Sequence, residues 1–151
     1  FARSGSRLSG HGQVKNFPRL RDELYASEGT LHYALHGLPQ EQGRPALRLK
    51  VEGMLQLTCQ RCLGPLAFAL RSEALLLLYG DEAEIAVLDA EGPESIVAER
   101  EMSVLDLVED EVLLALPIAP RHEQCRSRAG DAPAAQQQPF AGLRALLGGK
   151  R

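Results

Sequence analysis

The clearest pattern in the chain is an alternation of apolar and polar residues between Leu47 and Cys59. Apolar side chains and Gly53 occupy the odd-numbered positions, and mostly polar side chains occupy the even-numbered ones. A period of two over thirteen residues is typical of a half-buried strand, and a glycine inside such a run favours a bend. We therefore predict one long strand over residues 47–59, bent at Gly53.

Shorter alternating runs on both sides of this segment predict more strands. Residues 30–38 and 66–70 alternate in the same way. The long strand and the run at 66–70 are expected to form an antiparallel pair, joined by a turn at residues 60–63. Residues 75–79 either extend the second strand of this pair or form another one. Residues 85–88 are a weaker strand candidate.

Residues 103–116 predict the main helix. Ser103 followed by Asp106 resembles a capping box, with Asp in the place of the usual Glu, and Pro117 ends the segment. Consecutive helical residues point in different directions, so the acidic run at 109–111 predicts a solvated face and not a metal site. The apolar stripe of this helix comprises Leu105, Val108, Val112 and Leu116.

These elements predict the fold class α+β: an antiparallel β-sheet packed by one main helix, with short terminal helices and flexible ends. We expect a single α+β domain over residues 17–125, beginning with a short helix at 18–28. Residues 1–16, rich in Gly, Ser and Arg, predict a flexible N-terminal arm. Residues 126–138 predict a linker, and residues 139–151 a short amphipathic C-terminal segment.

The charge is unevenly distributed along the chain, although the net charge is only −3. Residues 1–50 carry eight basic and four acidic residues, residues 51–120 carry three and fourteen, and residues 121–151 carry six and two. The three balances are +4, −11 and +4, which sum to −3. Because phosphate neutralisation supplies much of the affinity for RNA, direct RNA contacts are expected at the ends of the chain. The acidic middle either keeps the protein soluble or suits a basic protein partner.

The cellular setting is predicted from hydropathy and cysteine content. No apolar run approaches the roughly 20 residues that span a bilayer, so we expect no membrane association. The chain has three cysteines, an odd number, and two of them lie close together in the sequence. This usage argues against a disulfide framework and for a reducing compartment, which predicts a cytoplasmic protein.

Two pairs of possible metal ligands are the strongest chemical signal. Cys59 and Cys62 form a C-x-x-C, and His122 and Cys125 form an H-x-x-C. Two short chelating pairs of this kind are the ligand set of a structural zinc site, so one structural zinc is a possible cofactor. Alternatively, two half-buried cysteines close a turn and Cys125 is unrelated to them. A redox pair is disfavoured because the Leu-Gly-Pro at 63–65 prevents a helix from following the motif.

The sequence contains no motif of an enzyme. It lacks a phosphate-binding P-loop, a dinucleotide-binding glycine motif, a nucleophile elbow and an H-E-x-x-H zinc motif. A zinc or thiol enzyme would need an open zinc position or a reactive cysteine. Arg61, inside the first ligand pair, is either a contact for a phosphate or carboxylate or a solubilising charge.

Four segments, taken together and in this order, resemble the YceD family, the large ribosomal RNA subunit accumulation proteins of bacteria and plastids. The resemblance runs from about residue 20 to the end of the chain. The segments at residues 53–63, 107–117, 120–125 and 139–143 read GMLQLTCQRCL, LVEDEVLLALP, PRHEQC and PFAGL.

The resemblance implies a non-enzymatic factor in ribosome biogenesis that supports accumulation of 23S rRNA. Its expected partner is ribosomal RNA or a large-subunit ribosomal protein, and no small-molecule substrate is expected. The alternatives are an adaptor that binds one basic ribosomal protein without touching RNA and, less favoured, a zinc or thiol enzyme. The candidate partner contacts are Arg61, Asp110, Arg121 and Phe140, and the family's marked positions correspond to Cys59, Arg61, Cys62, Asp110, Pro117, His122 and Cys125.

Overall fold

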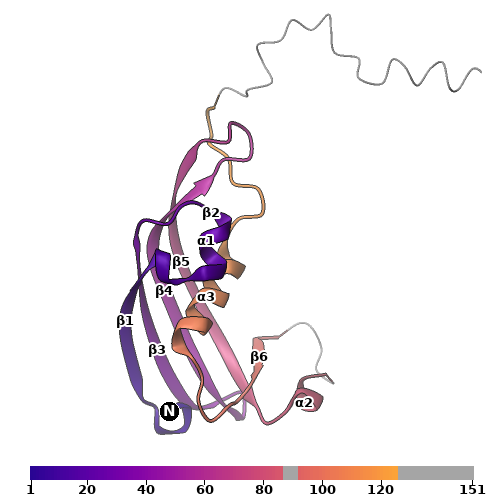
Figure 1. Ribbon diagram of the computed structural model, residues 1–151. Coiled ribbons are helices and arrows are strands. Elements are labelled where there is room, and N and C mark those ends of the chain that lie inside the picture. The colour runs from indigo at the N-terminus through magenta and orange to yellow at the C-terminus, as the bar shows by residue number, and fades with distance from the viewer. Residues whose placement is uncertain (87–91, 126–151) are drawn as a thin grey trace, which may run out of the picture.

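Six strands form one sheet, and helices α1 and α3 lie on one of its faces (Figure 1). The structure is a computed structural model that describes residues 1–86 and 92–125. None of the helices in these two ranges is long and apolar enough to cross a membrane. The elements in chain order are η1 (Ala2–Ser4), β1 (Arg7–Gln13), η2 (Val14–Asn16), α1 (Pro18–Glu23), β2 (Leu24–Ala26), β3 (Thr30–Glu41), β4 (Arg44–Thr58), β5 (Pro65–Tyr79), α2 (Glu82–Ala86), β6 (Glu94–Val97) and α3 (Val104–Ala115).

The strand order is β1-β3-β4-β5-β6, and β2 pairs with the part of β4 that β3 does not reach. All pairings are antiparallel except that of β5 with β6, which is parallel. The predicted α+β class is confirmed, but the sheet is mixed and not purely antiparallel. The chain passes through α2 between β5 and β6, and this longer connection allows a parallel return that a tight hairpin would not.

The predicted long strand is confirmed as β4, which lies at the centre of the sheet. Leu49, Val51 and Leu55 are fully buried, as the alternation requires. β4 pairs with β5 over most of its length, and the predicted strand at 75–79 is the end of β5. Gly53 lies opposite Leu31, where an added Cβ would come within 2.8 Å of the leucine side chain. A glycine is therefore needed there for β3 to approach.

Residues 1–16 do not form the predicted mobile arm. β1 pairs with β3 along its whole length, and Val14 is fully buried. Two glycines hide this strand from sequence analysis because they interrupt the alternation. A Cβ on Gly10 would lie 2.6 Å from the Tyr33 hydroxyl oxygen, and one on Gly12 would lie 2.9 Å from the Phe17 ring. These aromatic rings take the space that side chains of β1 would otherwise occupy.

Two further predictions are wrong in part, and tertiary packing explains both. The helix predicted over 18–28 ends at Glu23, because residues 24–26 pair with the free edge of β4 as β2. The strand predicted at 85–88 is not formed at Ile85, which lies in α2. This helix places Ile85 against a second apolar cluster on the other face of the sheet, built on Ala46, Leu77 and Tyr79.

The predicted helix after Ser103 is confirmed as α3. The Ser103 hydroxyl oxygen accepts a hydrogen bond from the backbone N–H of Asp106 at 3.2 Å. The apolar stripe is only half right, because Val108 and Val112 are fully buried whereas Leu105 is exposed. The predicted solvated acidic face is wrong for the two glutamates of the run, at positions 109 and 111, which are buried. α3 is therefore rotated relative to the orientation that its apolar residues suggest.

Replacing the N-cap residue should destabilise α3 measurably. In Ser103→Ala the N–H of Asp106 loses its acceptor, and we expect the free energy of unfolding to fall by about 1 kcal/mol. Urea unfolding would measure the change. Ser9→Ala, at an exposed serine of β1, is the control and should change the free energy by less than about 0.5 kcal/mol. Equal losses in the two variants would contradict a capping role for Ser103.

Candidate metal centre

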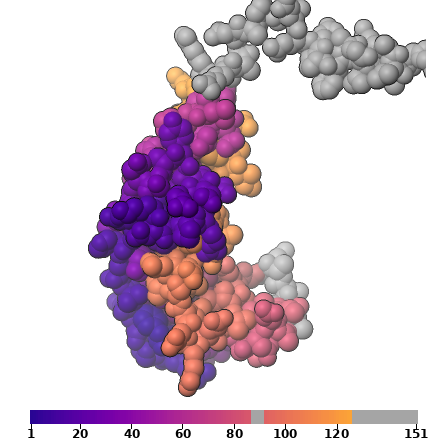
Figure 2. Space-filling view, in the orientation of Figure 1, coloured from indigo at the N-terminus to yellow at the C-terminus, as the bar shows by residue number. Residues whose placement is uncertain are grey.

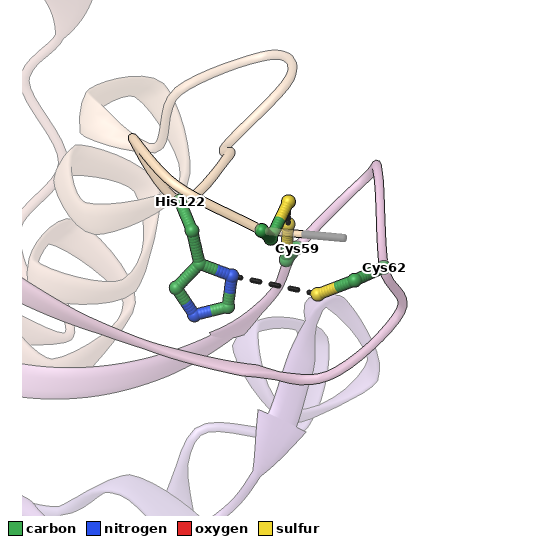
Figure 3. Close-up of side chains that lie close together, drawn as sticks. Cys59, Cys62 and His122 are labelled. Carbon is green, nitrogen blue, oxygen red and sulfur yellow. Dashed lines mark hydrogen bonds between the residues drawn. The ribbon is translucent and has the colours of Figure 1, made fainter. Parts of the chain in front are cut away.

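All four of the predicted metal ligands meet at one end of the sheet. Cys59 and Cys62 lie in the turn between β4 and β5, and His122 and Cys125 lie in the loop after α3. Their four ligand atoms lie within 4.8 Å of one another. In Figure 3, a ring nitrogen of His122 faces the sulfur of Cys62, and Cys59 lies beside them. Cys125 belongs to this group, which contradicts the alternative that it is unrelated to the C-x-x-C pair.

Backbone hydrogen bonds hold both ligand pairs in place. In the turn, the N–H of Cys59 donates to the Gly64 carbonyl at 2.9 Å, and the N–H of Leu63 donates to the Cys59 carbonyl at 2.8 Å. Leu63 adopts a left-handed conformation with φ of 60°, which is uncommon for a residue other than glycine. The N–H of Gln60 donates to the Pro120 carbonyl at 2.8 Å and so joins the turn to the loop after α3. The two ligand pairs are therefore already aligned by the backbone.

The orientation of the His122 ring suits a metal ligand. Its Nδ1 lies 3.5 Å from Cys62 Sγ, and its Nε2 lies 3.0 Å from the carbonyl oxygen of Pro65. A carbonyl only accepts hydrogen bonds, so Nε2 must carry the proton. In the neutral ring, the lone pair then lies on Nδ1, the nitrogen that faces Cys62. Donation from the other ring nitrogen to a backbone carbonyl is what fixes metal-bound histidines in many proteins.

The electrostatics of the cluster favour a bound cation. Burial raises the pKa of the Cys59 thiol, but backbone N–H groups of Cys62, His122 and Arg61 outweigh burial and lower that pKa to about 5. These donors therefore favour the thiolate form of Cys59. Burial and the neighbouring Cys59 sulfur raise the pKa of Cys125. A cation between the sulfurs would stabilise the Cys59 thiolate and would favour loss of the proton from Cys125.

Two of the distances between ligand atoms are close to those of a tetrahedral zinc centre. With Zn–S near 2.3 Å and Zn–N near 2.0–2.1 Å, a regular tetrahedron has S···S edges of ~3.8 Å and S···N edges of ~3.5 Å. The Sγ atoms of Cys59 and Cys125 are 4.0 Å apart, and Cys62 Sγ is 3.5 Å from His122 Nδ1. Three sulfurs and one nitrogen form a complete ligand set, which is the pattern of a structural zinc site.

The candidate partner contacts lie in three different environments. Arg61, in the β4–β5 turn, and Arg121, next to His122, are both exposed at the metal-binding end. Asp110 lies on α3, where its carboxylate accepts a hydrogen bond from Arg19 Nη1 at 2.6 Å. Phe140 lies outside the described residues. Sequence analysis therefore grouped Asp110, on α3, with two arginines that lie at the metal-binding end.

Sequence analysis missed the role of Glu109, the buried neighbour of Asp110. Glu109 Oε1 accepts hydrogen bonds from the backbone N–H groups of Arg19 at 2.7 Å and Leu20 at 3.0 Å, and Oε2 accepts one from Arg19 Nε at 2.9 Å. These N–H groups belong to the first turn of α1, which Figure 2 shows packed against α3. Phe17 at the N-cap has no side-chain oxygen that could accept a hydrogen bond. The sequence therefore did contain a signal that the first N–H groups of α1 need an acceptor from another part of the chain.

The charge state of Glu109 follows from these contacts. Burial raises its pKa, but the backbone N–H of Leu20 and both the side chain and the backbone of Arg19 outweigh burial, so the pKa is lowered. Glu109 is therefore ionised at neutral pH and acts as an N-terminal cap of α1 supplied by α3.

Comparison with known proteins agrees with the motifs. A family model described as "Large ribosomal RNA subunit accumulation protein YceD" matches residues 47–147, which are 101 of the 151 residues. The matched region begins in β4 and contains all four metal-ligand candidates. Searches of curated proteins and of solved structures gave no match. The chain belongs to the YceD family of large ribosomal RNA subunit accumulation proteins.

Proposed function

We propose that this protein is a non-enzymatic factor that acts in the cytoplasm on assembling large ribosomal subunits and supports the accumulation of 23S rRNA. Membership in the YceD family implies a role in the accumulation of large-subunit ribosomal RNA. The observation that carries the finer proposal is the closed set of four ligands inside the matched region. Such a set stabilises a surface and leaves no position on the metal for a substrate.

The metal of this proposal is one structural zinc ion held by Cys59, Cys62, His122 and Cys125. When bound, zinc supplies a cross-link between the β4–β5 turn and the loop after α3. This cross-link would fix the exposed guanidinium of Arg61 at the metal-binding end of the molecule. A fixed guanidinium loses less entropy on binding a phosphate or a carboxylate than a mobile one.

The three consecutive carboxylates of α3, at positions 109–111, are not arranged as a catalytic group. Glu109 caps α1, and Asp110 forms an ion pair with Arg19. Glu111 accepts a hydrogen bond from the Ser72 hydroxyl on the neighbouring strand. Each of these three carboxylates therefore has a structural partner, which supports a binding role over acid–base chemistry.

A second candidate function, an adaptor for one basic ribosomal protein, is favoured by a specific charge arrangement. Burial raises the pKa of Glu94, and the negative charges of Glu111 and Asp110 raise it further. Glu94 and Asp110 are exposed, and a basic partner that contacted them would offset their repulsion. In this reading the side of the molecule that carries α3 meets the partner protein and RNA is not contacted.

Sedimentation of the full-length protein with ribosomal particles tests the proposal. In cells that lack their own copy, the tagged protein should co-sediment with precursor large subunits in low-salt gradients. Arg61→Glu combined with Arg121→Glu should reduce the recovered fraction at least fivefold. Arg21→Glu with Arg100→Glu makes the same charge change at two other exposed arginines and should reduce it less than twofold.

Nuclease treatment distinguishes the two candidate functions. Release of the protein by nuclease would show attachment through RNA. Retention of a single basic protein after nuclease would establish the adaptor function instead. Recovery of neither precursor particles nor a basic protein would contradict both.

A further inference from the structure

The face of the sheet opposite α1 and α3 carries a group of exposed cations that none of the functions above uses. The even-numbered residues of β4, including Arg48 and Lys50, point to this face, because the odd-numbered ones are buried under the helices. Strand pairing adds Arg7 from β1 and Arg71 from β5. We call Arg7, Arg48, Lys50 and Arg71 the cationic face.

The register of the strands brings these residues into adjacent rows. Arg7 lies opposite His36, which lies opposite Arg48, so one row crosses three strands. In the next row Ser9 lies opposite Ala34, which lies opposite Lys50. Neighbouring strands are about 4.8 Å apart, and successive residues on one face of a strand are about 6.8 Å apart. Arg48 and Lys50 are therefore spaced at a distance comparable with successive phosphates, and the small side chains of Ser9 and Ala34 continue the row of Lys50.

The cationic face has more positive than negative charge. Glu73 is shared by two of the cations, at 3.7 Å from Arg48 and 3.0 Å from Lys50. Glu52, opposite Arg71, is the other carboxylate on these rows. Four cations and two carboxylates give a balance of +2, on a chain whose net charge is −3. The side chains of Arg48 and Lys50 remain 43% and 55% exposed, so both can reach a ligand.

Histidines extend this surface with rings that can stack on bases and donate hydrogen bonds. His11 and His32 lie opposite each other on β1 and β3, with ring centroids 6.1 Å apart. Together with His36 they place three of the four histidines of the chain on this face. Aromatic rings beside a positively charged surface are the usual arrangement for binding single-stranded nucleic acid.

We infer that the cationic face binds the phosphate backbone of RNA, an inference that rests on the proposed function and names a second contact surface for it. A polyanion is the ligand that a positive surface on an acidic protein selects. The sequence led us to expect RNA contacts only at the ends of the chain. Folding gives the N-terminal one of these ends a location, because the positively charged residues 1–50 form β1, β3 and the first half of β4, and so build half of the sheet.

Direct binding to defined RNA probes tests the inference. The purified full-length protein is titrated with a fluorescent uridine 20-mer and with a 16-base-pair RNA duplex at several salt concentrations. Arg48→Gln with Lys50→Gln should weaken binding to the preferred probe about tenfold at 0.1 M salt. Because each lost phosphate contact reduces the salt slope by ~0.7 on single strands and ~0.9 on duplexes, the slope should fall by ~1.4–1.8.

The control variant is Arg21→Gln with Arg100→Gln, which removes the same charge from exposed residues outside the cationic face. It should weaken binding less than twofold, and both variants should keep the wild-type melting temperature. Equal weakening in both variants, no binding by the wild type, or preference for an acidic peptide such as a glutamate 20-mer would overturn the inference. The failure of this inference and that of the proposed function can be told apart. Co-sedimentation with precursor subunits in a protein that does not bind the RNA probes would contradict the inference alone. Binding of the RNA probes without co-sedimentation would contradict the proposed function alone.

Discussion

Treating the zinc-loaded protein with a chelator at neutral pH should lower its melting temperature by about 10 °C. A ligand present at a thousand times its dissociation constant stabilises the folded state by about 4 kcal/mol, and 1 kcal/mol shifts the melting temperature of a domain of this size by about 2–4 °C. The loss should be reversible, because the core of the sheet does not contain the metal. Adding back zinc should restore the melting temperature, whereas magnesium should not.

Substitution of single ligands gives the same test without a chelator. Cys59→Ser and His122→Ala should each lower the zinc content from one per chain to less than about one tenth, because loss of one ligand opens a closed site. His32→Ala is the matched control, since it removes an exposed histidine that is not a candidate ligand and should leave one zinc per chain. A full zinc content in Cys59→Ser, or a melting temperature that the chelator does not change, would refute the zinc assignment.

Local signals were enough to predict β4, α3 and the metal-ligand candidates. The alternation of β4 is long, the Ser103 cap is a short-range interaction, and each ligand pair is only three residues apart in the sequence. Pair spacing predicts chelation even when the pairs are far apart, because loop closure costs little more for a long loop than for a short one. The meeting of the two pairs required the observed path of the chain from Pro117 to Cys125.

Other elements depend on contacts that no local pattern encodes. β1 could not be read from the sequence, because Gly10 and Gly12 owe their place to the rings of Tyr33 and Phe17. The cationic face was equally hidden, since Arg7 and Arg48 become neighbours only through the register of three strands. Charge summed along the chain therefore gave the positive sign of residues 1–50 but not their arrangement on one face of the sheet.

The buried Glu109 carboxylate of α3 should contribute more to the free energy of unfolding than an exposed carboxylate does. In Glu109→Ala, the backbone N–H of Leu20 loses its acceptor in a buried position and that of Arg19 loses it in a part-buried one, and a buried loss costs about 1–3 kcal/mol. We expect the free energy of unfolding to fall by about 3 kcal/mol in urea titrations. Glu109→Gln keeps one acceptor oxygen and should lose about half as much.

Asp110→Ala provides the control within the same cluster. Asp110 also binds Arg19, but both side chains are about half exposed, at 51% and 53%, and an exposed ion pair contributes about 0–1 kcal/mol. A loss in Glu109→Ala no larger than that in Asp110→Ala would mean that the capping of α1 by α3 contributes little.

Acid titration separates the charge of Glu109 from its hydrogen bonds. Because its pKa is lower in the folded than in the unfolded protein, its charge stabilises the fold fully above the ordinary glutamate pKa of about 4.3. That contribution is lost as the pH falls through the lowered folded pKa. The free energy of unfolding should therefore fall less steeply with decreasing pH in Glu109→Gln than in the wild type, and parallel curves would show that the carboxylate charge is not what holds α1 to α3.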